Sequence, residues 1–155
     1  MNESRAIVGY LVDTKNRDNS LYPTDAKLRY VIDQRLYFDA TVFSQRLSNA
    51  ISPIMRQSET VVAQDKKDAI TTALTTMEGF LEGQDWFSGT DNVSIADLSF
   101  LAAFSTLYHV GLDVSSYPNL SGWYERCAGL PGFGENEKGA KMFASFIKGK
   151  LTEPY

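Results

Sequence analysis

The sequence has very little of the two side chains that most often carry metals and nucleophilic catalysis. Its 155 residues include one cysteine, Cys127, and one histidine, His109. A single thiol cannot close a disulfide within the chain, and it has no second thiol with which to form a metal site. We interpret Cys127 as a buried small apolar residue and His109 as a helix-end residue, and we expect no metal site. Sparse cysteine is typical of a reducing compartment, so we expect a cytoplasmic location.

Positive charge and long apolar runs are also scarce. Lys and Arg total 15 against 19 Asp and Glu, which gives a formal net charge of −4. The basic residues are scattered, whereas nucleic-acid binding needs them concentrated on one surface. The apolar run at 6–12 lacks a small-residue cleavage pattern and is far shorter than the roughly 20 residues of a membrane span. We therefore expect no nucleic-acid partner, no membrane partner and no signal peptide.

Apolar residues recur at three- and four-residue steps, the period of an amphipathic α-helix, and no alternating strand pattern competes with it. The pattern predicts an opening helix, a long helix from near Asp25 until Pro53 kinks or ends it, and a helix that Ser58 caps and Gly83 closes. A shorter helix follows Pro118, and an amphipathic helix ends the chain. The pattern predicts an all-α domain, and the 43% of apolar residues predict that this domain has a real core.

The segment VSIADLSFLAAF, residues 93–104, is the most informative local stretch. Ser94 and Asp97 have the S-x-x-D spacing of a capping box, in which each side chain can bond to a backbone N–H near the other. The following residues are apolar almost all round, which is typical of a helix that runs through the centre of a domain. We therefore predict a central buried helix near residues 94–108, with Ser94 and Asp97 in a structural capping role.

Six motifs in order resemble an insect cytosolic glutathione transferase of the delta or epsilon class: ESRAI, SLYP, QRLYFD, VSIADLS, YPNLSGWYERC and PGFGENEKGAKMF. In that family a thioredoxin-like domain binds glutathione, and a helical C-terminal domain supplies the pocket for the electrophile. The resemblance implies a remnant last helix of a missing thioredoxin-like domain at 1–14 and a linker at 15–24. Residues 25–155 are then the all-helical C-terminal domain, a bundle of the glutathione-transferase type.

The same resemblance implies a glutathione site at the start of the first helix, with glutathione as co-substrate and no resident cofactor. Glu3 matches the family contact to the γ-glutamyl ammonium, and Ser4 with the helix N–H groups matches the contact to its carboxylate. Arg5, Asp39 and Ser94 match the surrounding polar network. The alternative is that Asn2 or Ser4 caps the helix, Glu3 complements its dipole and Arg5 is solvated.

The resemblance also implies a pocket for a small apolar electrophile. The matching positions on the long helix are Ser44, Leu47, Ala50 and Ser52, and Phe143 and Phe146 contribute from the last helix. The long-helix side chains are smaller and less aromatic than those the family uses, which favours a roomier pocket. The alternative for Leu47 and Ala50 is ordinary helix packing, because apolar stripes at helical spacing are more often core.

Two functions therefore remain open. The first is a glutathione transferase that joins the glutathione thiol to electrophiles in detoxification. The family's thiol-activating serine and cis-proline have no counterpart in this sequence, so we expect the 155-residue chain alone to be inactive. The second is a non-enzymatic helical module that binds apolar ligands or protein partners. Ile7, Tyr10 and Leu11 would face the sheet in the family fold, so without that sheet we expect self-association or a homodimer.

Overall fold

The computed structural model describes residues 2–15 and 20–155, and this part of the chain contains helices and no strand. The prediction of an all-α fold is therefore confirmed. The helices are α1 (Ser4–Lys15), α2 (Ala26–Phe38), the π-helical turn η1 (Asp39–Phe43), α3 (Ser44–Met55), α4 (Gln64–Phe80), α5 (Ile95–Val110), α6 (Pro118–Cys127) and α7 (Phe133–Lys148). Of the linker expected at 15–24, residues 16–19 lie outside the described residues.

The predicted long helix is present, but it is built from three consecutive parts. Asp25 caps its start, where the carboxylate accepts hydrogen bonds from the backbone N–H groups of Lys27 and Leu28, both at 3.0 Å. The π-helical turn η1 then joins α2 to α3 without a break. Pro53 does not end the helix, which continues to Met55. A proline this near a helix end removes a single backbone hydrogen bond, which the last turn can lose at small cost.

The boundaries predicted for the next helix were wrong. Helix α4 begins at Gln64 after Ala63, whose side chain makes no capping hydrogen bond. The Ser58 hydroxyl instead donates to the carbonyl of Pro53 at 3.2 Å, in the turn that follows α3. At the other end α4 stops at Phe80, and Gly83 lies in the following turn with a φ of 68°, a conformation that glycine adopts without strain.

Helix α5 is the predicted central helix, and its capping box is present. Ser94 is the N-cap residue: its hydroxyl accepts from the backbone N–H of Ala96, and the Asp97 carboxylate accepts from the backbone N–H of Ser94. Asp97 also accepts from the Phe87 N–H and from the Trp123 indole N–H. It therefore joins the start of α5 to the preceding loop and to α6, which confirms the structural role predicted for both residues.

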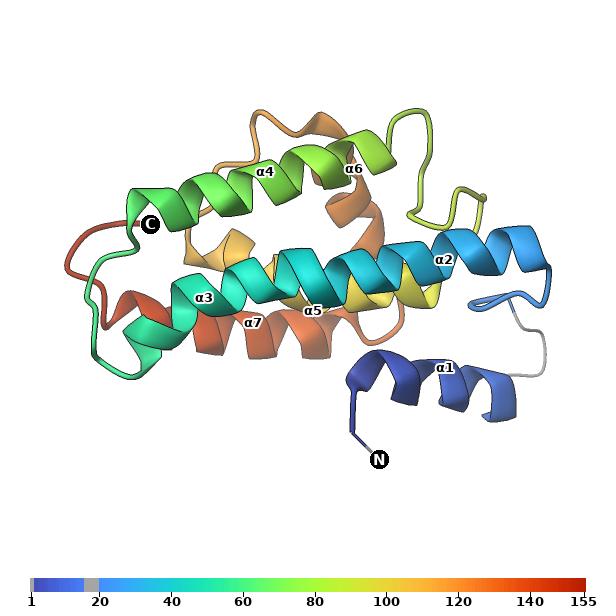
Figure 1. Ribbon diagram of the computed structural model, residues 1–155, viewed down its shortest axis with the longest axis horizontal. Helices are drawn as coiled ribbons and strands as arrows, with labels where there is room; N and C mark the ends of the chain where they lie inside the picture. Colours follow the sequence, from blue (N-terminus) through green and yellow to red (C-terminus); the bar gives the residue numbers. More distant parts are fainter. Residues whose placement is uncertain (1, 16–19) are drawn as a thin grey trace.

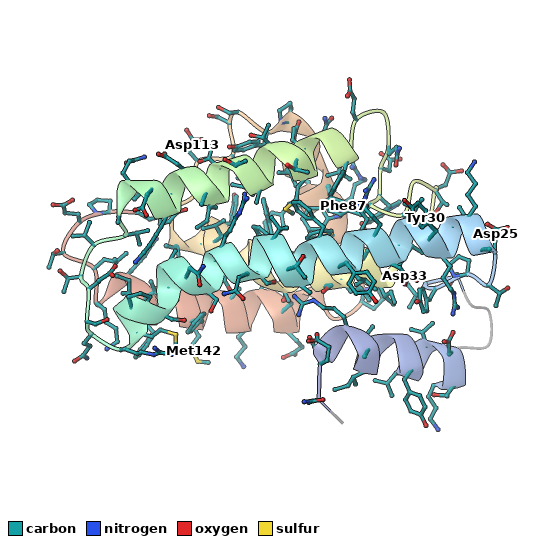
Figure 2. The ribbon with its side chains drawn as sticks, in the orientation of Figure 1. Asp25, Tyr30, Asp33, Phe87, Asp113 and Met142 are labelled. Atoms are coloured by element: carbon teal, nitrogen blue, oxygen red, sulfur yellow. The ribbon has the colours of Figure 1, made fainter. Side chains whose placement is uncertain are left out.

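The core surrounds α5. Phe87 lies between α2 and α4 in Figure 2, and its ring centroid is 4.4 Å from that of Phe100 and 5.1 Å from that of Trp123. Cys127 is fully buried, and burial raises the pKa of its thiol to about 12. A thiol held protonated in this way is a poor nucleophile, in agreement with the structural interpretation.

Helix α1 lies to one side of the bundle, below α2 in the view of Figure 1. Gly9 and Val12 are its buried residues, whereas Tyr10 is 53% exposed and Leu11 is 47% exposed. Two of the three residues of the expected apolar surface are thus exposed, whereas Ile7 is partly buried. Among the residues described, no helix has the length and apolar character needed to cross a bilayer.

Candidate functional site

A buried carboxylate connects the start of α1 to the bundle. Asp39 opens the η1 turn and is fully buried. Its Oδ2 atom accepts from Arg5 Nε at 3.1 Å, from Arg5 Nη2 at 2.8 Å and from the Ser99 hydroxyl at 2.5 Å. Its Oδ1 atom accepts from the Ser44 hydroxyl at 2.7 Å. Helices α1, α3 and α5 therefore meet at one charged group, which we call the Asp39 cluster: Arg5, Asp39, Ser44 and Ser99.

The Asp39 cluster holds the first turn of α1 in place. Arg5 Nη2 also donates to Ser44 Oγ at 2.8 Å, and Arg5 Nη1 lies 3.4 Å from Glu3 Oε1. Glu3 has a φ of 67°, which is uncommon for a residue with a side chain, and its carboxylate remains largely exposed. Ser4 begins the helix and is exposed. An accessible carboxylate and hydroxyl thus stand at a helix N-terminus, beside an arginine whose geometry is fixed by a buried aspartate.

Two cavities flank this helix start. One, of about 460 Å³, lies between α1 and the α2–η1 segment and is lined by Glu3, Arg5, Ala6, Tyr22, Asp33, Leu36, Tyr37, Ala40 and Thr41. The other, of about 280 Å³, lies between α1, α3 and α5 and is lined by Ser4, Arg5, Val8, Leu36, Ser44, Ile95, Leu98, Ser99, Ala102 and Ala103. Of the residues predicted to bind glutathione, Arg5 lines both cavities, Glu3 lines the first and Ser4 the second, whereas the buried Asp39 lines neither.

Two of the predicted residues make contacts that the family resemblance did not indicate, although Ser44 also lines the cavity of about 280 Å³. Ser94 does not join the polar network around Arg5, because its hydroxyl donates to Asp97 Oδ2 at 2.8 Å inside the capping box. Ser99 contacts Asp39 instead, from a position within α5. Ser44, predicted to line the electrophile pocket, is hydrogen-bonded to both Asp39 and Arg5. Ser99 was missed because its contact with Asp39 spans 60 residues and has no local pattern.

The other residues predicted for the electrophile pocket lie in different surroundings. Leu47 and Ala50 are buried in the hydrophobic core. Ser52 lines a groove of about 680 Å³ between α3 and α4, and its hydroxyl lies 3.2 Å from that of Ser48. Phe143 is partly buried against the core, whereas Phe146 is 51% exposed on α7. The described residues therefore do not gather these side chains around one cavity.

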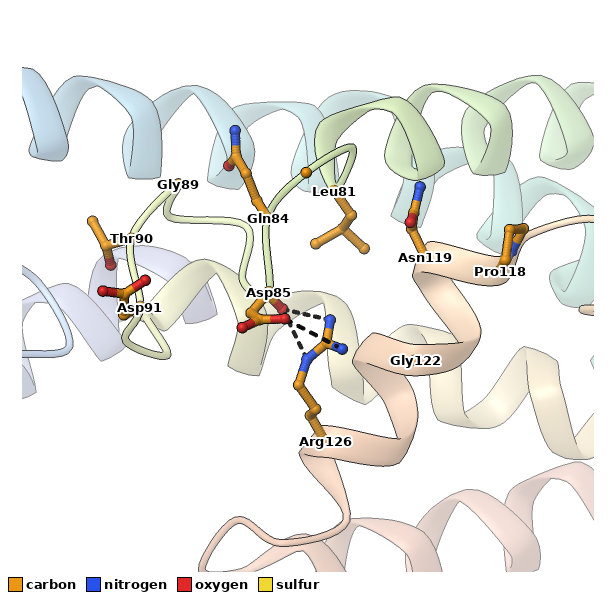
Figure 3. Close-up of a pocket in the computed structure, with 11 residues that line it drawn as sticks. Leu81, Gln84, Asp85, Gly89, Thr90, Asp91, Pro118, Asn119, Gly122 and Arg126 are labelled. Carbon is orange, nitrogen blue, oxygen red and sulfur yellow. Dashed lines mark hydrogen bonds and ion pairs between the residues drawn. The ribbon is translucent and has the colours of Figure 1, made fainter.

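A polar cavity of about 400 Å³ lies away from this region, between the loop after α4 and α6 (Figure 3). Arg126 donates to the backbone carbonyl of Asp85 at 2.9 Å and lies 3.5 Å from its carboxylate. None of the residues predicted to bind a ligand lines this cavity. Within 2–15 and 20–155, no group of three or more His, Cys, Asp or Glu side chains is arranged to hold a metal ion.

This all-helical architecture is that of a glutathione transferase C-terminal domain. The family model "Glutathione S-transferase, C-terminal domain" matches residues 38–131. Glutathione S-transferase D6 of Drosophila melanogaster is 34% identical over 152 residues, which cover 97% of this chain and 70% of the relative. The chain therefore belongs to the glutathione S-transferase family.

Solved structures agree over nearly the whole chain. Glutathione S-transferase unclassified 2 from Bombyx mori is 38% identical with a TM-score of 0.95, covering 99% of this chain and 71% of that one. A glutathione transferase homolog from Drosophila mojavensis, solved with bound glutathione, is 37% identical with a TM-score of 0.91, covering 97% and 69%. The similar structures include insect delta-class and epsilon-class enzymes, which confirms the resemblance seen in the sequence.

Proposed function

We propose that the start of α1 forms the γ-glutamyl part of a glutathione site in a transferase that conjugates the glutathione thiol to small apolar electrophiles, as in detoxification. The carrying observation is the Asp39 cluster, which fixes Arg5 beside the accessible side chains of Glu3 and Ser4. A γ-glutamyl group carries one ammonium and one carboxylate. Glu3 would pair with the ammonium, and Ser4 with the N–H groups of the first turn would bind the carboxylate.

The charges in this region support a zwitterionic ligand. Glu3 is weakly held by Arg5, at 3.4 Å and with most of its side chain in water, so an ammonium can pair with it at little cost. Arg5 is already neutralised by Asp39 at 2.8 Å, so in our proposal it orients the helix start and does not act as the main anion-binding group. We therefore expect binding of the ligand to depend on the carboxylate of Glu3 more than on the positive charge of Arg5.

We further propose that the 155-residue polypeptide, assayed by itself, does not activate the thiol. A free thiol has a pKa near 8.5, so a largely ionised thiol at neutral pH needs a shift of about two units, or roughly 2.7 kcal/mol. The two hydroxyls of the Asp39 cluster, on Ser44 and Ser99, both donate to Asp39. We propose that they hold Asp39, which leaves no hydroxyl of this cluster to donate to a thiolate.

For the electrophile, we propose a contact with Phe146 on α7, since Ser52 lies in the groove between α3 and α4 and Phe143 packs against the core. The exposure of Phe146 supports this assignment, because an apolar side chain on the surface is available to an apolar ligand.

The alternative function, a helical module that binds protein partners, is supported by the exposed Tyr10 and Leu11 on α1. We also propose a cytoplasmic location, supported by the reduced, buried Cys127.

Calorimetric titration of the 155-residue polypeptide with glutathione tests the binding site, and thiol transfer to chloro-dinitrobenzene on the same sample tests activation. The control for Glu3→Ala is Glu82→Ala, an exposed carboxylate in the turn after α4. We expect binding that Glu3→Ala weakens at least tenfold and Glu82→Ala leaves unchanged, with no turnover above the uncatalysed rate. Equal binding by all three proteins would refute the role of Glu3, and measurable turnover would refute the inactivity.

A further inference from the structure

The SLYP motif at residues 20–23 has no part in the function proposed above, yet its tyrosine lies between α1 and α2. The nearest atom to a Cβ built on Gly9 of α1 is Tyr22 Cε1, at 3.5 Å, so the ring packs against the backbone of α1. The Tyr22 hydroxyl donates to Asp33 Oδ1 on α2 at 2.5 Å. Tyr22 therefore connects the middle of α1 to a fixed acceptor on the long helix.

Arg29 reinforces this connection. Its guanidinium carbon lies 3.7 Å from the centre of the Tyr22 ring, and its Nη2 atom donates to Asp13 Oδ1 on α1 at 3.0 Å. The same guanidinium donates to the carbonyls of Tyr22 and Pro23, both at 2.8 Å. We call Asp13, Tyr22, Arg29 and Asp33 the Tyr22 clasp. It joins the C-terminal half of α1 to α2.

Helix α1 depends on such contacts because it has little apolar burial of its own. Only Gly9 and Val12 of its 12 residues are buried, so packing alone orients the helix weakly. Its position is set by polar contacts at two places, the Asp39 cluster at the N-terminal end and the Tyr22 clasp further along. A helix of this length is a stiff rod of roughly 18 Å, so a shift at the clasp is transmitted to its first turn.

The cavity between α1 and α2 is shared by the start of α1 and the Tyr22 clasp. Tyr22 and Asp33 line the same cavity of about 460 Å³ as Glu3 and Arg5, and Figure 2 shows where Asp33 lies along α2, the helix above α1. Loss of the Tyr22 contact would widen this cavity and would loosen the start of α1, where Glu3 and Arg5 line it.

We propose that the Tyr22 clasp positions the ligand-binding end of α1, with Tyr22 and Asp33 as positioning residues for Glu3 and Arg5. The identity of the ligand, glutathione, rests on the proposed function. The placement of Arg5 by the clasp does not rest on the proposed function, because the position of Arg5 can be measured without any ligand.

The test uses the full 155-residue chain and follows two signals by NMR: the Nε–H resonance of Arg5 and the hydrogen exchange of the α1 amides. Tyr22→Phe removes only the hydroxyl, and Asp33→Leu removes its acceptor. Asp33→Asn is the rescue variant, because its carbonyl oxygen still accepts from Tyr22. Tyr30→Phe is the matched control, since Tyr30 is 70% exposed on the same helix.

We expect the α1 amides to exchange about tenfold faster in Tyr22→Phe and Asp33→Leu, as for loss of a hydrogen bond to a charged acceptor. The Arg5 Nε–H resonance should shift in both, while the α5 amides keep their protection. Tyr30→Phe should resemble the unsubstituted chain, and Asp33→Asn, whose acceptor is neutral, should show a smaller change than Asp33→Leu. An unchanged Arg5 resonance in Tyr22→Phe would overturn the proposal, as would equal acceleration of α1 and α5, which would indicate a merely structural role.

Glutathione titration of the same proteins separates this proposal from the proposed function. If the unsubstituted chain binds glutathione, Tyr22→Phe should weaken binding by a factor similar to that for α1 exchange, and an unchanged affinity would overturn the clasp's role. If the unsubstituted chain does not bind, the proposed site at Glu3 is refuted for this polypeptide. The Arg5 resonance and the α1 exchange rates then decide on the clasp by themselves.

Discussion

Asp97 is the residue whose substitution should cost the fold most, and the structure allows the cost to be worked out atom by atom. The carboxylate is fully buried. Its Oδ1 atom accepts from the Phe87 N–H at 2.9 Å and from the Trp123 indole at 3.0 Å. Its Oδ2 atom accepts from the Ser94 N–H and the Ser94 hydroxyl, both at 2.8 Å. Burial raises the pKa of Asp97, while these four donors act in the opposite direction.

Two variants of Asp97 test this account. Asp97→Ala removes both acceptor oxygens, whereas Asp97→Asn removes one oxygen and keeps the size of the side chain. Asp97→Ala leaves three N–H donors buried without a partner, on Phe87, Ser94 and Trp123, at about 1–3 kcal/mol each. Asp97→Asn keeps one oxygen for two donors, and the Ser94 hydroxyl can turn to accept from the new amide. One backbone N–H then stays unpaired, so the expected cost is about 1–3 kcal/mol plus a small loss of favourable helix-dipole charge.

Urea unfolding followed by circular dichroism and by tryptophan emission measures both costs, because Trp123 reports on the site itself. Asp91→Asn, at an exposed position in the preceding loop, is the control and should change the unfolding midpoint little. We expect Asp97→Ala to lose at least twice the free energy of unfolding that Asp97→Asn loses, or to fail to fold. Equal losses in the two variants, or a loss below about 0.5 kcal/mol in either, would refute the donor count as the source of the effect.

Three further predictions concern other sites. Asp39→Ala should lower the free energy of unfolding by about 3–5 kcal/mol in urea, because it leaves the half-buried Arg5 without its carboxylate, whereas Asp39→Asn should cost less. Burial and the charge of Lys141 lower the pKa of His109 in the folded chain. As the pH falls below about 6.5, the unfolded chain therefore binds the proton first, and the free energy of unfolding should decrease. His109→Gln should flatten this pH dependence, measured as the urea midpoint at each pH. Replacing both Tyr10 and Leu11 with serine should reduce self-association in sedimentation at high concentration, and an already monomeric unsubstituted chain would contradict this.

The parts of the molecule that could be predicted from the sequence depend on residues close together in the chain. The capping box is such a case, because Ser94 and Asp97 are three residues apart and each bonds to the backbone of the other's turn. The helical period likewise predicted α5 and the start of the long helix near Asp25. The start of α4 could not be predicted in this way, because Ala63 stands at the N-cap position and its side chain makes no hydrogen bond. Ser58, a residue type that often caps helices, was therefore predicted in its place.

The Asp39 cluster could be predicted only in part, because its contacts cross 34 and 60 residues of sequence. The family resemblance pointed to Arg5 and Asp39 together, but it pointed to Ser94 where the structure has Ser99. Both serines belong to the start of α5, where they are five positions apart. Ser94 is occupied by the capping box, so the hydroxyl that reaches Asp39 comes from the next turn.

The π-helical turn η1 is what brings Ser44 to the Asp39 carboxylate. In an α-helix two residues five positions apart differ by about 140° around the axis, so Asp39 and Ser44 would point to different sides. In η1 the Ser44 N–H bonds to the Asp39 carbonyl five residues back, and the Ser44 hydroxyl lies 2.7 Å from Asp39 Oδ1. The wide turn thus brings a second donor to the buried carboxylate without interrupting the long helix. Such turns occur often at functional sites, and here the turn supports the arginine that orients the proposed glutathione-binding residues.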